Sequence, residues 1–379
     1  MSLSSTLDWP IQFCVFTTAA TYIVSVITSN VSQVDRLWTF LPTIYTAYYA
    51  LLPLFPAHQP FLLVPYNFLG STDYNPRALL MFALVFLWMC RLSYNTQRRG
   101  LFNPKDEDYR WAVLRKQLPP WLFQIVNLTF ISAIQNVLLL LLGLPTRTVA
   151  LSQPRSSLET SDYALASLAL LVLLLEFTAD NQQYAYQTYK HAFLAKEKGA
   201  TDVKAYDESK QWIGARLSWT PDDARRGFIT RGLWRYSRHP NFACEQSFWW
   251  IITFFPLVAS VPPNLPTHSD FPPLRIIIHA LQFRDLHQPL LNGLRAILLD
   301  AGINLLPGAA LSLLFFSSTL YTEAITSSKY PIAYKAYQKR VGMFGPAMTA
   351  IKAIAIKFSG KERDVDRLVW GDSQQSKKE

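Results

Sequence analysis

Long apolar runs dominate the chain. Windows of about 17–24 residues carry almost no charge, which is the length that an α-helix needs to cross a hydrocarbon core of about 30 Å. These runs predict membrane-spanning helices at 11–29, 37–55, 77–92, 121–144, 163–179, 243–260 and 301–321. The predicted fold is therefore all-α, a polytopic transmembrane helix bundle of about seven spans.

The segments between these runs alternate in positive charge. Lys and Arg together number six in 94–120, eleven in 181–242 and eleven in 322–379, but two in 145–162 and three in 261–300. Because basic loops are retained in the cytoplasm, this alternation predicts a lumenal N-terminus and a cytoplasmic C-terminus. We expect one membrane domain over 1–358, with a variable extramembrane loop at 261–289, and a disordered cytoplasmic tail at 359–379.

The composition supports a membrane protein. Only 16% of the residues are charged, against roughly 25% in an average soluble domain. The net charge of +10 is explained by the basic loops, so we expect no nucleic-acid partner. The cysteines, Cys14, Cys90 and Cys244, lack a CxxC motif or a nearby histidine at ligand spacing, and we expect neither a disulfide framework nor a metal site.

Aromatic residues gather near the ends of the predicted spans. Tyr and Trp at such positions are typical of the belt at the membrane–water interface. We therefore expect the following residues in that belt: Tyr45, Tyr48, Tyr49, Trp249 and Trp250.

Polar residues also cluster at the predicted cytoplasmic ends of four spans. They are Arg91 and Tyr94 after the third span, Glu176 and Asp180 at the fifth, Arg238, His239, Asn241 and Glu245 at the sixth, and Glu323, Lys329 and Tyr330 after the seventh. Such residues are costly in lipid and mark functional sites. Arg238 and a helix that begins at Pro240 offer the cationic and N–H donors that a pyrophosphate needs. The chain lacks the GxGxxG motif of soluble dinucleotide-binding folds.

Five sequence blocks follow one another at these sites. They are VDRLWTFLPTIY, CRLSYNTQRRG, EFTADNQQYAYQ, GLWRYSRHPNFACE and KYPIAYKAYQ. In their order and spacing the chain resembles the steroid 5-alpha-reductase superfamily, specifically its domain-of-unknown-function branch. The resemblance implies an NADPH-dependent membrane reductase of the endoplasmic reticulum. Such an enzyme delivers hydride to a carbon–carbon double bond conjugated to a carbonyl, here in a lipid or sterol-like molecule.

The resemblance also assigns roles to individual residues. Asp180 falls on the acidic residue of the family's cofactor motif, and Arg238, His239, Asn241 and Glu245 fall on its Arg-His-Pro-Asn…Glu motif. Tyr330, next to Lys329, falls on the family's Tyr-Pro pair, and Arg91 is placed like an arginine that faces the nicotinamide and phosphates. The expected cofactor-binding set comprises these eight residues.

Tyr94 is the candidate acid that polarises the substrate carbonyl, because negative charge builds on that oxygen during hydride transfer. Two positions depart from the family pattern. Cys244 stands where the family usually has Gly, and Trp88 stands about where steroid reductases have their substrate-polarising Tyr.

Two other functions remain open. Methyltransferases of the isoprenylcysteine carboxyl type also place Arg-His-Pro at a helix mouth and bind S-adenosylmethionine. They have Ser or Gly where this chain has Asn241, and a Glu pair where Glu323 stands alone. A non-catalytic lipid-binding or scaffold protein is the third interpretation, which Cys244 favours.

Overall fold

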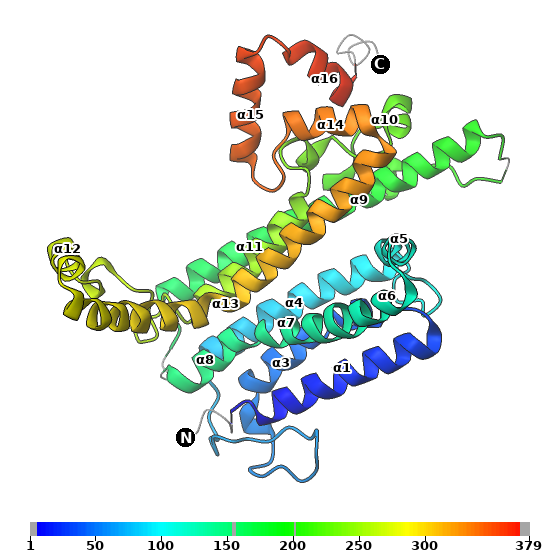
Figure 1. Ribbon diagram of the computed structural model, residues 1–379. Coiled ribbons are helices and arrows are strands. Elements are labelled where there is room, and N and C mark those ends of the chain that lie inside the picture. Colours follow the sequence, from blue (N-terminus) through cyan, green and yellow to red (C-terminus); the bar gives the residue numbers. More distant parts are fainter. Residues whose placement is uncertain (1–5, 154–156, 201, 372–379) are drawn as a thin grey trace. The chain divides into compact units, whose positions relative to one another are not determined.

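Helices make up all the regular secondary structure in residues 6–153, 157–200 and 202–371, the part of the chain that this computed structural model describes (Figure 1). The chain forms two compact units. The first unit comprises Met1–Leu170 and Trp249–Ser312, and the second comprises Leu171–Phe248 and Leu313–Glu379. Three helices contribute residues to both units: α9 (Thr160–Glu197), α11 (Pro240–Phe254) and α13 (Arg284–Lys329).

The remaining helices belong to one unit each. The first unit contains α1 (Asp8–Thr28), α2 (Gln33–Leu37), α3 (Leu41–Ala50), α4 (Pro76–Arg98), α5 (Tyr109–Gln117), α6 (Pro120–Val126), the π-helical η2 (Asn127–Ile134), α7 (Gln135–Leu141), α8 (Leu144–Ser152) and α12 (Leu274–Gln282), with 3₁₀ turns η1 (Leu52–Leu54) and η6 (His268–Asp270). The second contains α10 (Pro221–Arg226), α14 (Pro331–Arg340), α15 (Pro346–Phe358) and α16 (Glu362–Trp370), with 3₁₀ turns η3 (Glu208–Lys210), η4 (Ile213–Ala215) and η5 (Gly232–Arg235).

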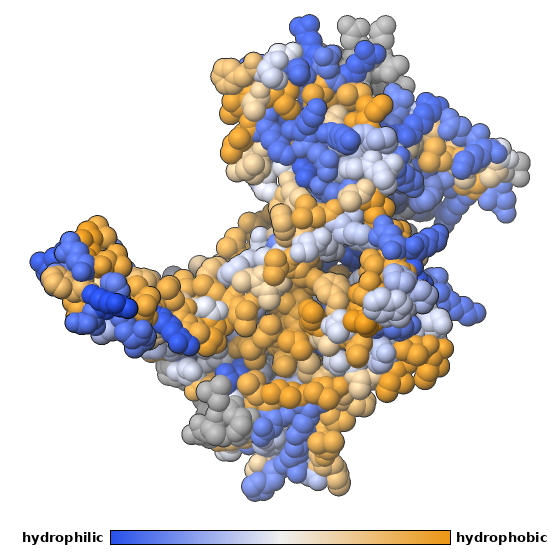
Figure 2. All heavy atoms as spheres, in the orientation of Figure 1, coloured by the Kyte–Doolittle hydropathy of each residue, from blue (hydrophilic) through white to orange (hydrophobic). Residues whose placement is uncertain are grey.

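Five helical segments in the described residues are long and apolar enough to cross a membrane. They are Asp8–Thr28, Pro76–Arg98, Pro120–Ser152, Thr160–Glu197 and Ala301–Lys329. The all-α class and the membrane character predicted from the sequence are thus supported. Figure 2 shows the corresponding hydrophobic surface over these helices.

The other two predicted spans fall on shorter helices. Residues 37–55 contain α3, which has 10 residues, and residues 243–260 overlap α11, which has 15 and begins at Pro240. At 1.5 Å per residue, neither helix alone reaches the roughly 30 Å of a hydrocarbon core. Proline explains the breaks, because Pro53 and Pro256 follow the last turns of these helices and cannot donate the next backbone hydrogen bond.

The tyrosines expected in an interfacial belt instead form the core of the first unit. Tyr45, Tyr48 and Tyr49 on α3 are fully buried, and the Trp9 ring of α1 lies 4.4 Å from the Tyr48 ring, centroid to centroid. Gly143 allows this packing, because a Cβ there would lie only 2.6 Å from the Cβ of Tyr45. Since the helices exclude lipid from this face, the belt interpretation is wrong for these three residues.

The two tryptophans predicted for the belt, Trp249 and Trp250, also make contacts within the protein. Trp249 is buried, with its ring 4.9 Å from that of Trp88. Trp250 is partly buried and donates its indole N–H to Ser312 Oγ at 2.9 Å. A partner for the N–H is what a buried indole requires.

Two segments predicted to lie outside the spans, the variable loop and the C-terminal tail, contain helix. The loop predicted at 261–289 includes α12 and the beginning of α13. The tail predicted at 359–379 includes α16, in which Val369 is fully buried and the Trp370 ring contacts the guanidinium groups of Arg235 and Arg340. Arg340 also pairs with Asp366 at 2.8 Å. Residues 372–379 of the predicted tail lie outside the described part.

A buried ion pair ties α4 to α9 within the first unit. Arg77 Nε donates to Asp162 Oδ1 at 2.6 Å and its Nη2 to Asp162 Oδ2 at 3.0 Å. Both side chains are buried, and Gln153 on the chain after α8 accepts from the same guanidinium. The polar residues at this end of the two helices therefore satisfy one another.

We expect Arg77→Met to lower the stability of the protein by about 3–5 kcal/mol, because Asp162 is left as an uncompensated buried charge. Thermal unfolding in detergent measures the loss. The matched control is Arg225→Met, which breaks an exposed pair with Glu197 and is expected to cost less than about 1 kcal/mol. Equal losses of stability in the two variants would show that the buried pair contributes no more than the exposed pair.

Candidate functional site

A buried charge cluster lies at the start of α11 in the second unit. Its centre is Glu323 of α13, which is 4% exposed. Arg238 donates two hydrogen bonds to this carboxylate, from Nε to Oε1 at 2.6 Å and from Nη2 to Oε2 at 3.0 Å. His239 Nε2 lies 2.9 Å from Oε1, and Gln338 Nε2 donates to Oε2 at 2.9 Å. Both carboxylate oxygens are therefore fully used by neighbouring side chains.

Backbone hydrogen bonds fix the same segment. The amide of Arg238 donates to Gly342 O at 2.9 Å, and the amide of His239 donates to Met343 O at 3.0 Å. The remaining donors of the Arg238 guanidinium, on Nη1, reach the carbonyl oxygens of Gln338 and Val341. The Arg-His-Pro motif is thus bound to the connection between α14 and α15 by both main chain and side chain.

The protonation state of His239 follows from its surroundings. Burial lowers the pKa of His239 below its usual range, and Glu323 opposes this shift while Arg238 adds to it. The imidazole is therefore neutral near pH 7. Because the Glu323 carboxylate only accepts, the hydrogen on His239 resides on Nε2, and Nδ1 is the acceptor nitrogen.

A second polar contact joins α9 to α11. Asn241 Nδ2 donates to Asp180 Oδ1 at 3.2 Å. The other amide atom, Asn241 Oδ1, is buried and receives no hydrogen bond from the described residues. Glu176 lies four residues before Asp180 and Glu245 four residues after Asn241, so each shares a helix face with its neighbour, and both are buried. The structure thus brings together the two predicted cofactor segments that contain Asp180 and Asn241.

Loops around this contact are tied to α9. Gln182, directly after the Asp180-Asn181 pair, accepts from the Leu233 amide at 2.9 Å and donates to Gly214 O at 2.8 Å. Trp234 Nε1 donates to Ala179 O at 3.2 Å. Residues 179–182 in the middle of α9 therefore hold the segment before Arg238 in place.

The predicted Lys329 and Tyr330 lie where α13 ends and α14 begins. Pro331 disfavours helical backbone at the residue before it, which explains the break at Tyr330. The Tyr330 ring packs at 5.8 Å from Phe228, and Lys329 is exposed with its Nζ 5.5 Å from the same Tyr330 ring. Gly227 has φ +89°, and a Cβ there would lie 2.2 Å from the Tyr330 ring, so only glycine fits this contact.

The predicted Arg91 and Tyr94 belong to α4 in the first unit. Tyr94 is 53% exposed, and the Arg98 guanidinium lies 5.0 Å from its ring centroid. Arg91 is partly buried. The structure thus divides the predicted set into two residues of the first unit and seven residues of the second.

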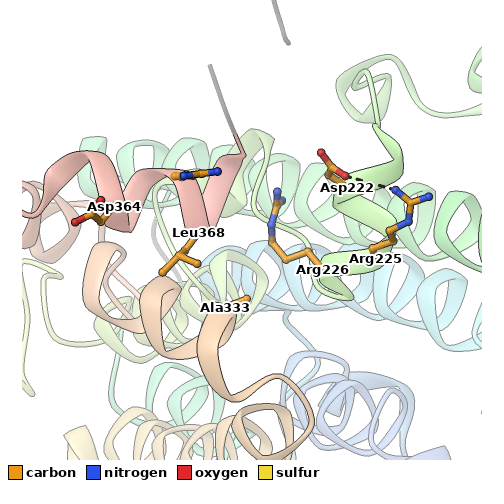
Figure 3. A pocket seen from close by; sticks show the side chains of 7 residues that line it. Asp222, Arg225, Arg226, Ala333, Asp364 and Leu368 are labelled. Carbon is orange, nitrogen blue, oxygen red and sulfur yellow. Dashed lines mark ion pairs between the residues drawn. The ribbon is translucent and has the colours of Figure 1, made fainter. Parts of the chain in front are cut away.

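A separate surface cavity of about 700 Å³ lies between α10 and α16 (Figure 3). Asp222, Arg225 and Arg226 of α10 line it together with Asp364 and Leu368 of α16. The arginines are paired there, Arg225 with Glu197 and Arg226 with Asp223, each at 2.8 Å. None of the predicted site residues lines this cavity.

Three residues in or next to the charge cluster lie outside the cofactor-binding set expected from the sequence: Glu323, which the sequence places only among the polar residues at the span ends, Gln338 and Lys352. Lys352 Nζ donates to Gln338 O at 2.6 Å. Glu323 could have been found from the sequence, because a lone Glu in a long apolar helix requires a cation beside it. Among the described residues, no group of three or more His, Cys, Asp and Glu side chains is arranged to hold a metal ion.

Comparison with known proteins places this helical membrane protein in a family. A family profile described as "Protein of unknown function (DUF1295)" matches residues 21–264. The chain belongs to the DUF1295 family. It is 29% identical over 325 residues to an uncharacterized protein of Schizosaccharomyces pombe (strain 972 / ATCC 24843), an alignment that covers 86% of this chain and 75% of that protein. No solved structure matches the chain.

Replacing Glu323 tests whether the cluster is structural. We expect Glu323→Leu to cost about 3–5 kcal/mol of stability, because Arg238 is then buried without a counter-charge. Gln338→Leu removes only one neutral donor from the same carboxylate and is expected to cost about 1 kcal/mol. Thermal unfolding of the two variants measures the difference, and a Glu323→Leu loss no larger than that of Gln338→Leu would contradict the central role of Glu323.

The lowered pKa of His239 predicts a pH dependence. The unfolded chain binds a proton to this histidine below about pH 6.5, whereas the folded protein binds it only at lower pH, so stability falls as the pH drops from about 7 towards 5. His239→Gln keeps a donor for Glu323 but does not titrate. We expect the melting temperature of this variant to depend less steeply on pH over that range. Parallel curves for the variant and the natural protein would assign the acid sensitivity to other groups.

Proposed function

We propose that this protein is a membrane-embedded oxidoreductase of the steroid 5-alpha-reductase superfamily. It uses NADPH to reduce a carbon–carbon double bond conjugated to a carbonyl in a lipid or sterol-like substrate. The observation that carries the proposal is the hydrogen bond of 3.2 Å between Asp180 and Asn241. These two residues are 61 positions apart, and the resemblance assigns both to the cofactor.

The donors and acceptors at this contact suit a nicotinamide nucleotide. Asn241 Oδ1 is a buried acceptor without a hydrogen bond from the described residues, and an amide N–H or a ribose hydroxyl of the cofactor supplies the missing donor. The Asp180 carboxylate is a second acceptor suited to hydroxyl groups. NADPH, when bound, supplies the hydride, and Asp180 and Asn241 bind and orient it.

The Arg-His-Pro motif suggests that Arg238 and His239 contact the cofactor. In this proposal they instead hold the start of α11 in place. The Arg238 guanidinium is engaged by Glu323 and by two backbone carbonyl groups, so it is a positioning residue for the start of α11 rather than a phosphate ligand. Lys329, exposed at the end of α13, is the cation of the predicted set that is available to a phosphate. The roles of Arg91 and Tyr94 rest on the resemblance.

The proposal extends to topology and location. Seven membrane passes, a lumenal N-terminus and a cytoplasmic C-terminus would place the basic segments 94–120, 181–242 and 322–379 on one side of the membrane. In this arrangement α3 and α11 contribute the two shorter passes together with the residues next to them. We propose the endoplasmic reticulum as the site of action, because its membrane contains lipids and its cytoplasmic face is in contact with cytosolic NADPH.

Ligand titration distinguishes the proposed function from its alternatives. A ligand that binds only the folded state raises the melting temperature with its concentration. We expect NADPH to raise the melting temperature of the purified protein more than NADH or S-adenosylmethionine does. We also expect Asn241→Ala and Glu245→Ala each to weaken NADPH binding about tenfold, as the loss of one buried hydrogen bond does.

The control for these variants is Ser247→Ala on the exposed face of the same helix, where the hydroxyl donates to Ala243 O of its own helix. Its NADPH affinity is expected to stay unchanged. A larger response to S-adenosylmethionine would favour the methyltransferase. No response to any of the three ligands would favour a non-catalytic lipid-binding protein.

A further inference from the structure

Helix α15 has its apolar side outward. The side chains of Met348, Ile351, Ile354 and Phe358 are 49%, 57%, 57% and 89% exposed. They follow one another at intervals of three or four residues, so they form one stripe along the helix. None of these four side chains is polar. In Figure 2, hydrophobic atoms gather over α15, whereas much of the neighbouring surface of the second unit is hydrophilic.

Two polar residues in the middle of α15, Thr349 and Lys352, form hydrogen bonds with the protein on the other side of the helix. Lys352 Nζ donates to Gln338 O at 2.6 Å and to Val341 O at 3.2 Å. Thr349 is buried, donates to Tyr236 O at 2.6 Å and accepts from the Gly342 amide at 2.8 Å. A surface helix in water has the opposite arrangement, with its apolar stripe against the core and its lysines in solvent. An inverted helix of this kind requires an apolar environment on its outer side.

We propose that α15 lies in the membrane–water interface, with the stripe of Met348, Ile351, Ile354 and Phe358 inserted among the lipid acyl chains. The second unit contains residues 313–329 of α13, the last part of a membrane-length helix. Only the ten-residue α14 and a short connection separate the end of α13 from α15. The helix is therefore attached close to a point where the chain leaves the bilayer.

The charges at the end of α15 match a lipid surface. Lys357 directly precedes Phe358 and Lys361 lies three residues after it, and both are exposed. The exposed Arg363 stands farther on, between Glu362 and Asp364 in the first turn of α16. Long basic side chains beside an inserted apolar face place their charged ends among phosphate headgroups, and they bind most strongly to anionic lipids. A soluble protein partner would not need this combination of an apolar stripe and a basic end.

Fluorescence quenching in vesicles tests this placement. The full chain, with Cys14, Cys90 and Cys244 replaced by alanine, receives one cysteine at Ile354 or, in a second variant, at Ile351, and each is labelled with an environment-sensitive dye. Asp364→Cys on the exposed side of α16 is the matched control. All variants are reconstituted into vesicles of phosphatidylcholine and phosphatidylserine, and the dye is exposed to spin-labelled lipids or to aqueous iodide.

We expect spin-labelled lipids to quench the dye at positions 354 and 351, at a depth of about 5–10 Å below the headgroups, and iodide to have little effect there. The dye at position 364 is expected to show the reverse. Strong iodide quenching at 354 and 351 would overturn the proposal by placing the stripe in water. Protection from both quenchers would also overturn it, because a protein surface, such as a second copy of the chain, would then cover α15.

Discussion

The second unit depends on the need to compensate one buried carboxylate. Glu323 lies in the apolar helix α13, where an ionised side chain is costly unless opposite charge and hydrogen bonds surround it. Arg238 meets that need with two parallel hydrogen bonds, and His239 and Gln338 complete it. Because these partners come from the segment before α11 and from α14, one carboxylate determines where three chain segments lie.

This constraint changes how the Arg-His-Pro motif is understood. Read as a linear motif, Arg238 offers a cation to a phosphate. In the folded unit the same cation stabilises the start of α11 and the α14–α15 connection. Under the proposed function this positioning would still serve the cofactor, because Asn241 is held in the first turn of α11, where it donates to Asp180. The atom of this contact that lacks a hydrogen bond from the described residues is an acceptor, Asn241 Oδ1.

The C-terminal part of the chain is integral to this arrangement. The family profile ends at residue 264, before Glu323 and Gln338. Yet α14 supplies a donor to Glu323, and α16 packs onto α14 through Val369 and the Arg340–Asp366 pair. The region after α13 is therefore a structured cap of the second unit, and α15 is its apolar outer element.

The sequence by itself determined the class of fold and the approximate position of most membrane-length helices, such as α1, α4 and α9. The physical reason is local. In lipid every backbone N–H and C=O group must form a hydrogen bond within its own segment, so a long apolar run forms an α-helix. The sequence also contains the prolines that shorten α3 and α11, but the apolar pattern alone predicted helices that run past them.

Only the tertiary structure decided which polar residues meet. Arg238 and Glu323 are 85 positions apart, and no periodicity encodes their pairing. The burial of Tyr45, Tyr48 and Tyr49, which depends on the close approach that Gly143 permits, and the docking of α16 are likewise long-range events. A side chain's local sequence predicts its helix and face, but whether lipid, water or another helix covers that face depends on packing between distant segments.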